Sequence, residues 1–155
     1  MTEQTATRQI GGDQARLSDV AAAAQSVAHE AQGRSYTYGG KTPNGFDCSG
    51  FVSYVLQQVV PSFHFMRAED FAGSASFASV DTPIPGDLIY FLSGPVPYEV
   101  SRGVNRVFPS HIGIVLDSDH WIGAQTSTGV AVVSMSNSWW KDRKKIFLRF
   151  KLVSR

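Results

Sequence analysis

Two stretches in the first half of the chain repeat apolar residues at the spacing of an amphipathic helix. The first begins at Ser18, a suitable N-cap, and ends at Gly33, whereas the second begins at about Cys48 and ends at Pro61. The apolar positions are Val20, Ala23, Ala24, Val27 and Ala31 in the first and Phe51, Val52, Val55, Leu56 and Val59 in the second. The segment "YTYGGKTPNG" between them is dense in glycine, proline and asparagine, so it predicts a loop.

After Pro85 the apolar residues form short runs separated by Asp, Ser and Gly turns. These runs are rich in β-branched and aromatic residues, which favour strands. They span residues 87–92, 111–117, 120–126, 129–135 and 145–153. Two N-terminal helices followed by about five strands predict an α+β domain in which the helices pack on an antiparallel sheet. Residues 62–85 show no clear period, and we expect them to be irregular or weakly helical.

The chain reads as one domain preceded by a short leader. Residues 1–16 are polar and we expect them to be flexible, whereas residues 17–155 show no internal repeat, low-complexity tract or linker. A chain of 155 residues suits a single domain that buries about two-thirds of the surface its unfolded form exposes.

Composition and charge exclude several classes of protein. The net charge of +1 gives no electrostatic case for nucleic acid or an anionic membrane as a partner. We interpret the basic run from Lys141 to Lys145 as a solvated flank of the last strand. No segment approaches the ~18 uninterrupted apolar residues of a membrane-spanning helix, and the N-terminus lacks the apolar core of a signal peptide.

Cys48 is the single cysteine, so the chain forms no intramolecular disulfide. In "GFDCSGFVSYV" it lies where the glycine-rich loop meets the first turn of the second helix. Free N–H groups and the helix dipole at this place favour the thiolate and could hold an oxyanion. Because free cysteines are often buried, the pattern alone leaves a structural thiol and a nucleophile both open.

A thiolate nucleophile needs a general base, and His111 is the best placed of four histidines. It opens the strand "HIGIVLD" directly after "FPSH", so its ring can lie at a sheet edge. His29 lies within a helix, His64 lies between two phenylalanines, and His120 lies in a hairpin turn. A helix N-terminus packed on the start of that strand would bring Cys48 and His111 together. Taken alone, His111 fits a surface histidine equally well.

Four segments, in chain order, resemble a known family. They are "YTYGG" followed by "DCSGFV", then "PGDLIYF", then "SHIGIVL", then "WIGAQTSTGV". From about Arg34 to about Val133 the chain resembles the NlpC-type papain-like cysteine peptidases, which cut bacterial cell-wall peptides. The resemblance implies a papain-like fold with no metal or organic cofactor. The chain likewise has no histidine pair at metal-ligand spacing.

Matched position by position, the resemblance implies that Cys48 is the nucleophile and His111 the general base. Four further residues match positions that contact the substrate: Tyr36, Asp47, Ser49 and Ser110. The tyrosine is the one whose hydroxyl lies beside the nucleophile in the family. The aspartate and the first serine match residues that hold polar groups of the stem peptide.

The sequence departs from the family where the third catalytic residue is expected. That residue is typically a histidine just before an alanine in the strand after the base, and Gly123 stands there. Alternate residues of a strand share a face, so Gln125 is the best substitute, with an amide oxygen that could accept from the His111 ring. His120, His64 or a dyad without a third residue are the alternatives.

A second departure is the connection of 17 residues from Ser93 to Pro109, which is longer than the family's. Long loops in compact domains are often lids or recognition loops. We expect this one to border the cleft, with Tyr98, Arg102 and Arg106 contacting the substrate.

These residues predict a cysteine hydrolase of peptidoglycan stem peptides. Family precedent favours the bond between γ-D-glutamate and the diamino acid. One alternative is a papain-like acyltransferase or amidase with a non-wall substrate. Another is a wall-binding module with a decayed active site, which Gly123 favours.

The N-terminus shows neither a signal peptide nor a wall-binding domain. We therefore expect synthesis in the cytoplasm, export by a dedicated secretion system, and action as an antibacterial effector in the periplasm or cell wall of a target bacterium. This expectation implies a cognate immunity protein and a secretion-system component as partners of a monomeric enzyme.

Overall fold

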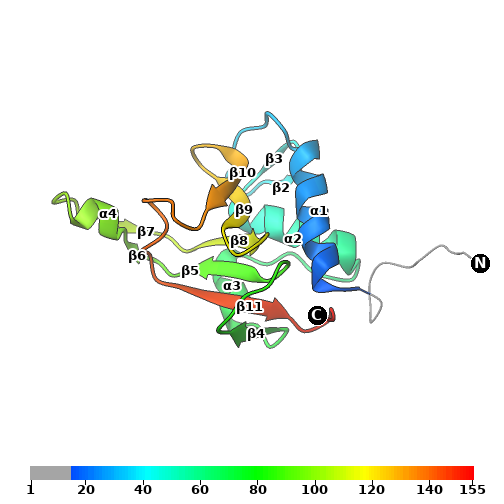
Figure 1. Ribbon diagram of the computed structural model, residues 1–155. Helices are drawn as coiled ribbons and strands as arrows, with labels where there is room; N and C mark the ends of the chain where they lie inside the picture. The colour runs from blue at the N-terminus through cyan, green and yellow to red at the C-terminus, as the bar shows by residue number, and fades with distance from the viewer. Residues whose placement is uncertain (1–14) are drawn as a thin grey trace, which may run out of the picture.

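The computed structural model describes residues 15–155. The two predicted helices are α1 (Leu17–Glu30) and α2 (Cys48–Val59), which pack against each other on one side of a sheet (Figure 1). The start of α1 was predicted wrongly, because its N-cap is Arg16 and not Ser18. Its first turn is held locally by Asp19, whose carboxylate accepts from the Arg16 N–H at 2.9 Å. It is also held from far along the chain, since the Leu17 N–H donates to the Ser154 carbonyl at 2.7 Å.

The sheet has six strands in the order β10-β9-β8-β5-β11-β4, and all neighbours are antiparallel. The strands are β4 (Phe77–Val80), β5 (Leu88–Phe91), β8 (His111–Val115), β9 (His120–Gln125), β10 (Gly129–Ser134) and β11 (Lys145–Phe150). The α+β class and the five predicted strands are confirmed. The segment expected to be irregular or weakly helical contains the short helix α3 (Ala68–Gly73), which agrees with that expectation, and the edge strand β4, which the sequence analysis did not predict.

Both faces of the central strands are buried, which explains why their sequences read as apolar runs and not as alternating patterns. In β5, Leu88 and Tyr90 face the helices, whereas Ile89 and Phe91 face a smaller cluster on the other side. That second cluster is completed by Val115, Trp121 and Val133. The second face is therefore also a packed surface, and it is the face on which alternation places the side chain of His111.

A buried ion pair ties the start of β5 to β11. Asp87 is fully buried and accepts from Arg149 at both carboxylate oxygens, at 2.8 and 2.7 Å. The same carboxylate accepts from the N–H of Ile84 at 2.8 Å, which closes the turn before the strand. Gly86, with φ at 99°, completes this turn, since a Cβ there would lie 2.0 Å from the Leu17 carbonyl oxygen.

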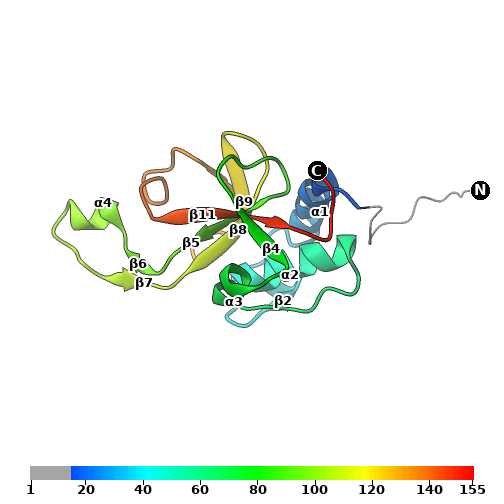
Figure 2. The ribbon, with the colours of Figure 1, turned by 90° about the horizontal axis from the view of Figure 1, so that it is seen from below.

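The long connection before His111 is folded and not an open loop. It forms a two-stranded ladder of β6 (Gly94–Pro95) and β7 (Val107–Phe108), with helix α4 (Pro97–Val100) at its tip. Figures 1 and 2 both show this arm projecting away from the rest of the molecule. The expected loop 93–109 is thus corrected to a hairpin-like arm.

The remaining elements lie near the N-terminus. Strands β2 (Lys41–Thr42) and β3 (Gly45–Phe46) pair within the predicted loop. Most of the predicted leader lies outside the described residues. Ala15, however, is fully buried, and Arg16 forms an isolated parallel β-bridge with Ser154. None of the helices in residues 15–155 combines the length and apolarity needed to cross a membrane.

Candidate active site

The start of α2 is fixed by the side chain of Asp47. This residue is the N-cap, and its Oδ1 accepts from the N–H of Gly50 at 2.6 Å and from the hydroxyl of Ser49 at 3.1 Å. Its Oδ2 accepts from the N–H of Gly39 at 3.0 Å, so the same carboxylate also holds the preceding loop. The neighbour of this cap, Cys48, is therefore held at a rigid helix N-terminus.

The glycines of the two motifs allow the loop to lie directly on the helix. A Cβ at Gly50 would be 1.9 Å from the carbonyl oxygen of Gly40, and a Cβ at Gly40 would be 1.9 Å from that of Gly45. The backbone N–H of Asp47 donates to the Gly40 oxygen at 3.0 Å. Close backbone contact is thus the physical reason why "YGG" and "DCSG" occur together.

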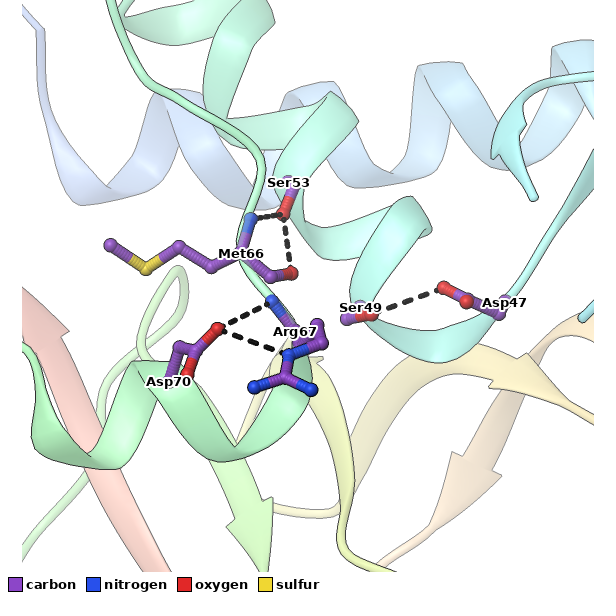
Figure 3. A network of polar contacts seen from close by, with 6 residues as sticks. All are labelled: Asp47, Ser49, Ser53, Met66, Arg67 and Asp70. Carbon is purple, nitrogen blue, oxygen red and sulfur yellow. Dashed lines mark hydrogen bonds and ion pairs between the residues drawn. The ribbon is translucent and has the colours of Figure 1, made fainter. Parts of the chain in front are cut away.

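Figure 3 shows how polar contacts extend from this helix to the segment that follows it. The hydroxyl of Ser53, buried in α2, bonds to both the N–H and the carbonyl of Met66, at 3.2 and 3.3 Å. One residue later, Arg67 pairs with Asp70 in the first turn of α3. The contacts place the segment after α2 back against the helix that carries Cys48.

A pocket of about 760 Å³ brings together most of the predicted site residues. Its lining includes Tyr36, Cys48, Ser110, His111 and Gln125. Three elements supply the central residues, because Cys48 begins α2, His111 begins β8 and Gln125 ends β9. Two substrate positions implied by the resemblance, Asp47 and Ser49, are not part of this lining, and their contacts are with the cap itself.

Cys48 is 9% exposed, and its environment favours the neutral thiol. Burial raises the pKa of Cys48 to about 11, and the charge of Asp47 raises it further, although N–H groups of Ile112, Ser49 and Cys48 itself oppose the change. The helix terminus alone predicts the thiolate, but desolvation outweighs it here. The resting thiol therefore has to lose its proton during the reaction.

Tyr36 lies beside the sulfur. Both residues line the same pocket, and the backbone and the thiol of Cys48 are close enough to influence the phenol. Burial, and then the neighbouring Cys48 and Asp47, raise the pKa of Tyr36 to about 12, so its hydroxyl keeps its proton. A neutral hydroxyl in this position can donate to an oxygen that binds next to the sulfur.

His111 is held by Gln125. Its Nε2 lies 3.1 Å from the Oε1 of Gln125. A ring nitrogen that faces an amide oxygen carries the proton, which leaves Nδ1 as the acceptor. Burial lowers the pKa of His111 to about 4, with the nearby charge of Arg143 acting in the same direction and the bond to Gln125 opposing them. The ring is thus neutral at pH 7, with an unprotonated Nδ1.

An aromatic cluster encloses the imidazole, and the sequence reading missed it. The ring of Trp140 stacks on His111 with centroids 4.7 Å apart, and Trp121 and Phe91 complete the enclosure at 5.8 and 6.2 Å. Arg143 lies over Trp140 at 4.8 Å and is only 4% exposed, so the interpretation of residues 141–145 as a solvated flank was wrong at this position. The adjacent tryptophans in "SWWKDR" are the sequence feature that could have indicated this aromatic cluster.

The alternatives to Gln125 lie elsewhere. The ring of His120 bonds to Asp117 at 3.0 Å in an exposed turn, and neither His120 nor His64 lines the pocket. In the arm, Phe108 and Pro109 contribute to the pocket lining. The three residues expected to contact the substrate are not part of it: Tyr98, Arg102 and Arg106. Arg106 pairs instead with Glu99 within the arm.

Nothing in the described part of the chain gathers three or more metal-binding side chains of the His, Cys, Asp or Glu type. The groups in the pocket are a thiol, an imidazole, a phenol and an amide, which suit acyl transfer through sulfur. An α2 N-terminus that presents a cysteine to the first residue of a sheet strand is the arrangement of papain-like thiol hydrolases.

The chain belongs to the NlpC/P60 family, whose model matches residues 33–149. This family consists of cysteine peptidases and amidases, in agreement with the class that the fold and the pocket define. The expectation drawn from the sequence motifs is thereby confirmed at the level of the family.

Relatives with assigned names support the same placement. The chain is 33% identical to the "Probable endopeptidase NlpC" of Escherichia coli, over 82% of this chain and 78% of that protein. It is 36% identical to the "Probable peptidoglycan endopeptidase LytE" of Bacillus subtilis, over 72% of this chain but 29% of that protein. A "Gamma-DL-glutamyl hydrolase" of the same organism is 32% identical over 85% of this chain and 30% of its own length. The chain thus spans less than a third of these two longer relatives.

Solved structures show the same fold. The NlpC/p60 domain of the peptidoglycan hydrolase SagA is 28% identical, with a TM-score of 0.55 over 81% of this chain and 96% of that domain. NlpC2 from Trichomonas vaginalis, at 20% identity, has a TM-score of 0.66 over 97% of this chain and 51% of that protein. The second comparison shows the fold alone.

Proposed function

We propose that this chain hydrolyses amide bonds in peptidoglycan stem peptides, and that the bond cleaved joins γ-D-glutamate to the diamino acid. The observation that carries the proposal is the pocket that the Cys48 thiol shares with a neutral, Gln125-bonded His111. Relatives named as peptidoglycan endopeptidases, and one named as a γ-DL-glutamyl hydrolase, support the substrate class and the bond.

The first half of the reaction forms a thioester. Nδ1 of His111 takes the proton of the Cys48 thiol while the sulfur attacks the amide carbonyl carbon. The N–H groups that surround the sulfur, together with the Tyr36 hydroxyl, stabilise the negative charge on the carbonyl oxygen. His111 then returns its proton to the leaving amine nitrogen, and the carbon–nitrogen bond breaks.

The second half releases the acid. Water replaces the departed amine, and Nδ1 of His111 takes one of its protons as the oxygen attacks the thioester carbon. The carbon–sulfur bond breaks, and the Cys48 sulfur recovers a proton from the imidazole. Because the thiol and the imidazole are both neutral at rest, each half-reaction begins with a proton transfer and not with a preformed ion pair.

The pocket fits a short peptide. Its volume of about 760 Å³ lies within the range of sites that enclose a small ligand. Apolar side chains of β10 and the polar turn after β9 both line it, so it offers surface for a peptide with apolar and charged parts. The alternative of a wall-binding module with a decayed active site rested on Gly123, which provides no side chain to orient the base. Gln125 weakens that alternative, because its amide oxygen lies beside the His111 ring.

Digestion of defined muropeptides tests the proposal. We expect the wild-type protein to yield the two fragments of a cut between γ-D-glutamate and the diamino acid, identified by mass spectrometry. Cys48→Ala should lower the rate by about 10³-fold or more. Cleavage by Cys48→Ala at the wild-type rate, or no cleavage of any muropeptide by the wild type, would contradict the proposal. Transfer of the acyl group to an added amine in place of water would favour the acyltransferase alternative.

A further inference from the structure

The carboxamide of Gln125 is held from two sides, by His111 and by Thr128. Its Oε1 faces the His111 ring, and its Nε2 donates to the hydroxyl oxygen of Thr128 at 3.4 Å. Thr128 follows in the tight turn between β9 and β10, where its N–H donates to the Gln125 carbonyl at 3.2 Å. The Thr128 hydroxyl, which accepts the hydrogen bond from the Gln125 amide, is therefore held in place by the same turn.

The hydrogen bonds around Thr128 give the carboxamide a direction. The Thr128 hydroxyl has a single proton, and it donates this proton to the carbonyl of Gly129 at 2.9 Å. Its oxygen can then act only as an acceptor toward Gln125, which selects the NH₂ side of the amide. The opposite side, Oε1, is left to face His111.

This direction sets the tautomer of the imidazole. An amide oxygen beside Nε2 requires the proton to be on Nε2, so Nδ1 has a free lone pair. With the carboxamide turned by 180°, the NH₂ group would face Nε2, and the neutral ring would hold its proton on Nδ1. That tautomer cannot take a proton at Nδ1, so the ring could not serve as the base there.

Gly123 leaves room for the oxygen end of the Gln125 carboxamide, because it has no side chain. A Cβ at this position would lie 2.8 Å from Oε1 of Gln125 and 3.1 Å from Cζ3 of Trp121. The first distance is shorter than real Cβ contacts, so any side chain at 123 would displace the oxygen that accepts from His111. The glycine is thus the space in which the carboxamide lies.

We propose that Thr128 and Gly123 are positioning residues that fix the direction of the Gln125 carboxamide and thereby the Nε2-protonated tautomer of His111. This inference rests on the proposed function only in giving His111 the role of base, because the tautomer itself is a property of the resting protein. It concerns residues that act on His111 through Gln125.

The test measures the tautomer directly, by ¹⁵N chemical shifts of the histidine rings at pH 7, with the His111 signals assigned from their loss in His111→Ala. In the wild type we expect a protonated Nε2 and an unprotonated Nδ1. Thr128→Val should raise the fraction protonated at Nδ1 and lower kcat/KM on a muropeptide about twofold to tenfold, the range for one hydrogen bond. Thr128→Ser, which keeps the hydroxyl, should restore both. Gly123→Ala should shift the tautomer in the same direction as Thr128→Val.

Matched controls separate positioning from general destabilisation. Thr82→Val removes an exposed threonine outside the pocket lining, and Gly73→Ala adds a Cβ in open space. Both should leave the tautomer and the turnover unchanged. Gln125→Glu offers two acceptor oxygens, so adding Thr128→Val to it should no longer change the ratio of the two neutral tautomers.

Failure of the positioning role and failure of the proposed function give different experimental results. The proposal is overturned if Thr128→Val and Gly123→Ala keep the wild-type tautomer, or if Thr128→Ser behaves like Thr128→Val. If the wild type cuts no muropeptide but Thr128→Val and Gly123→Ala change the tautomer as expected, the proposed function is refuted and the positioning role is supported. If the wild type cuts muropeptides but the two variants keep the wild-type tautomer, the proposed function is supported and the positioning role is refuted.

Discussion

The imidazole of His111 stacks on the indole of Trp140, with ring centroids 4.7 Å apart and planes 29° from parallel. The indole thereby covers one face of the ring and excludes water from it. Burial is the largest cause of the low pKa of His111, so this stacking contributes to keeping the base neutral.

Replacing Trp140 should therefore raise the pKa of His111. We expect Trp140→Ala to move it upward from about 4, toward the ordinary value of 6.5, by about one unit, because water reaches the ring and stabilises its charged form. The acid limb of kcat/KM should move to higher pH with it. An NMR titration of the ring measures the shift, and Trp140→Phe, which keeps an aromatic surface, should show a smaller one. A Trp140→Ala protein that remains folded with an unchanged titration would contradict this account.

The reactivity of Cys48 should depend on pH as that of a buried thiol. With a pKa of about 11, its thiolate fraction is small at neutral pH and grows as the pH rises toward 11. Alkylation by iodoacetamide should therefore continue to accelerate above pH 9, where a free thiol of ordinary pKa levels off. Glutathione treated in parallel provides the reference. A Cys48 rate that is already constant between pH 6 and pH 8 would show a lowered pKa instead.

The ion pair between Asp87 and Arg149 should stabilise the domain far more than an exposed pair does. Arg149→Met leaves a fully buried carboxylate without its partner, and we expect it to lower the free energy of unfolding by about 3–5 kcal/mol. Arg67→Met removes a pair whose side chains are 77% and 49% exposed, and should lower it by less than about 1 kcal/mol. Urea unfolding of the two variants measures the difference. Equal effects would refute the role given to the buried pair.

The arm formed by β6, α4 and β7 should influence substrate choice. Its base contributes Phe108 and Pro109 to the pocket, and its ladder is separate from the main sheet. Replacing residues 96–106 by Asn-Gly, a favoured two-residue hairpin turn, should preserve the six-stranded sheet and change the preference among muropeptides of different length. Circular dichroism checks the fold. Identical kcat/KM values across the series would remove the arm from substrate recognition.

Action against a rival cell stays a prediction from the sequence, and expression can test it. Directed to the periplasm of a Gram-negative host, the wild-type chain should lyse cells, whereas Cys48→Ala in the same compartment should not. Untargeted wild-type chain, kept in the cytoplasm, should be harmless. Equal lysis by the Cys48→Ala form would exclude the proposed chemistry as its cause, and survival of cells with active periplasmic enzyme would argue against an effector.

The parts of the site that follow from local pattern could be predicted from the sequence. The glycine-rich loop, the Asp-Cys-Ser-Gly block and the alternation along β9, read together with the family resemblance, select Cys48, His111 and Gln125 as candidates. The structure places all three in the lining of one pocket. The identity of the N-cap of α1 could not be predicted, because the Leu17 N–H is satisfied by Ser154 at the other end of the chain. Such a contact leaves no mark on the neighbouring sequence.

Electrostatic properties were harder to infer for a related reason. The position of Cys48 at a helix N-terminus predicts a lowered pKa, but burial by distant segments raises it. Arg143 lies in a run of charged residues that reads as solvated, yet it packs on Trp140 and donates to the carbonyls of Leu92 and Pro109. In both cases the deciding quantity is how much water the tertiary structure removes, which a local pattern does not contain.

The place of β11 within the sheet has a consequence for biosynthesis. This strand is the last of the six strands of the sheet to leave the ribosome, yet it pairs with β5 on one side and β4 on the other. Until it emerges, those two strands lack their shared neighbour, and the Asp87 carboxylate lacks Arg149. Pairings this distant in sequence form slowly. The six-stranded sheet can therefore be completed only once β11 has been synthesised, so we expect a chain that ends before β11 to lack the pairing that joins β4 to the rest of the sheet.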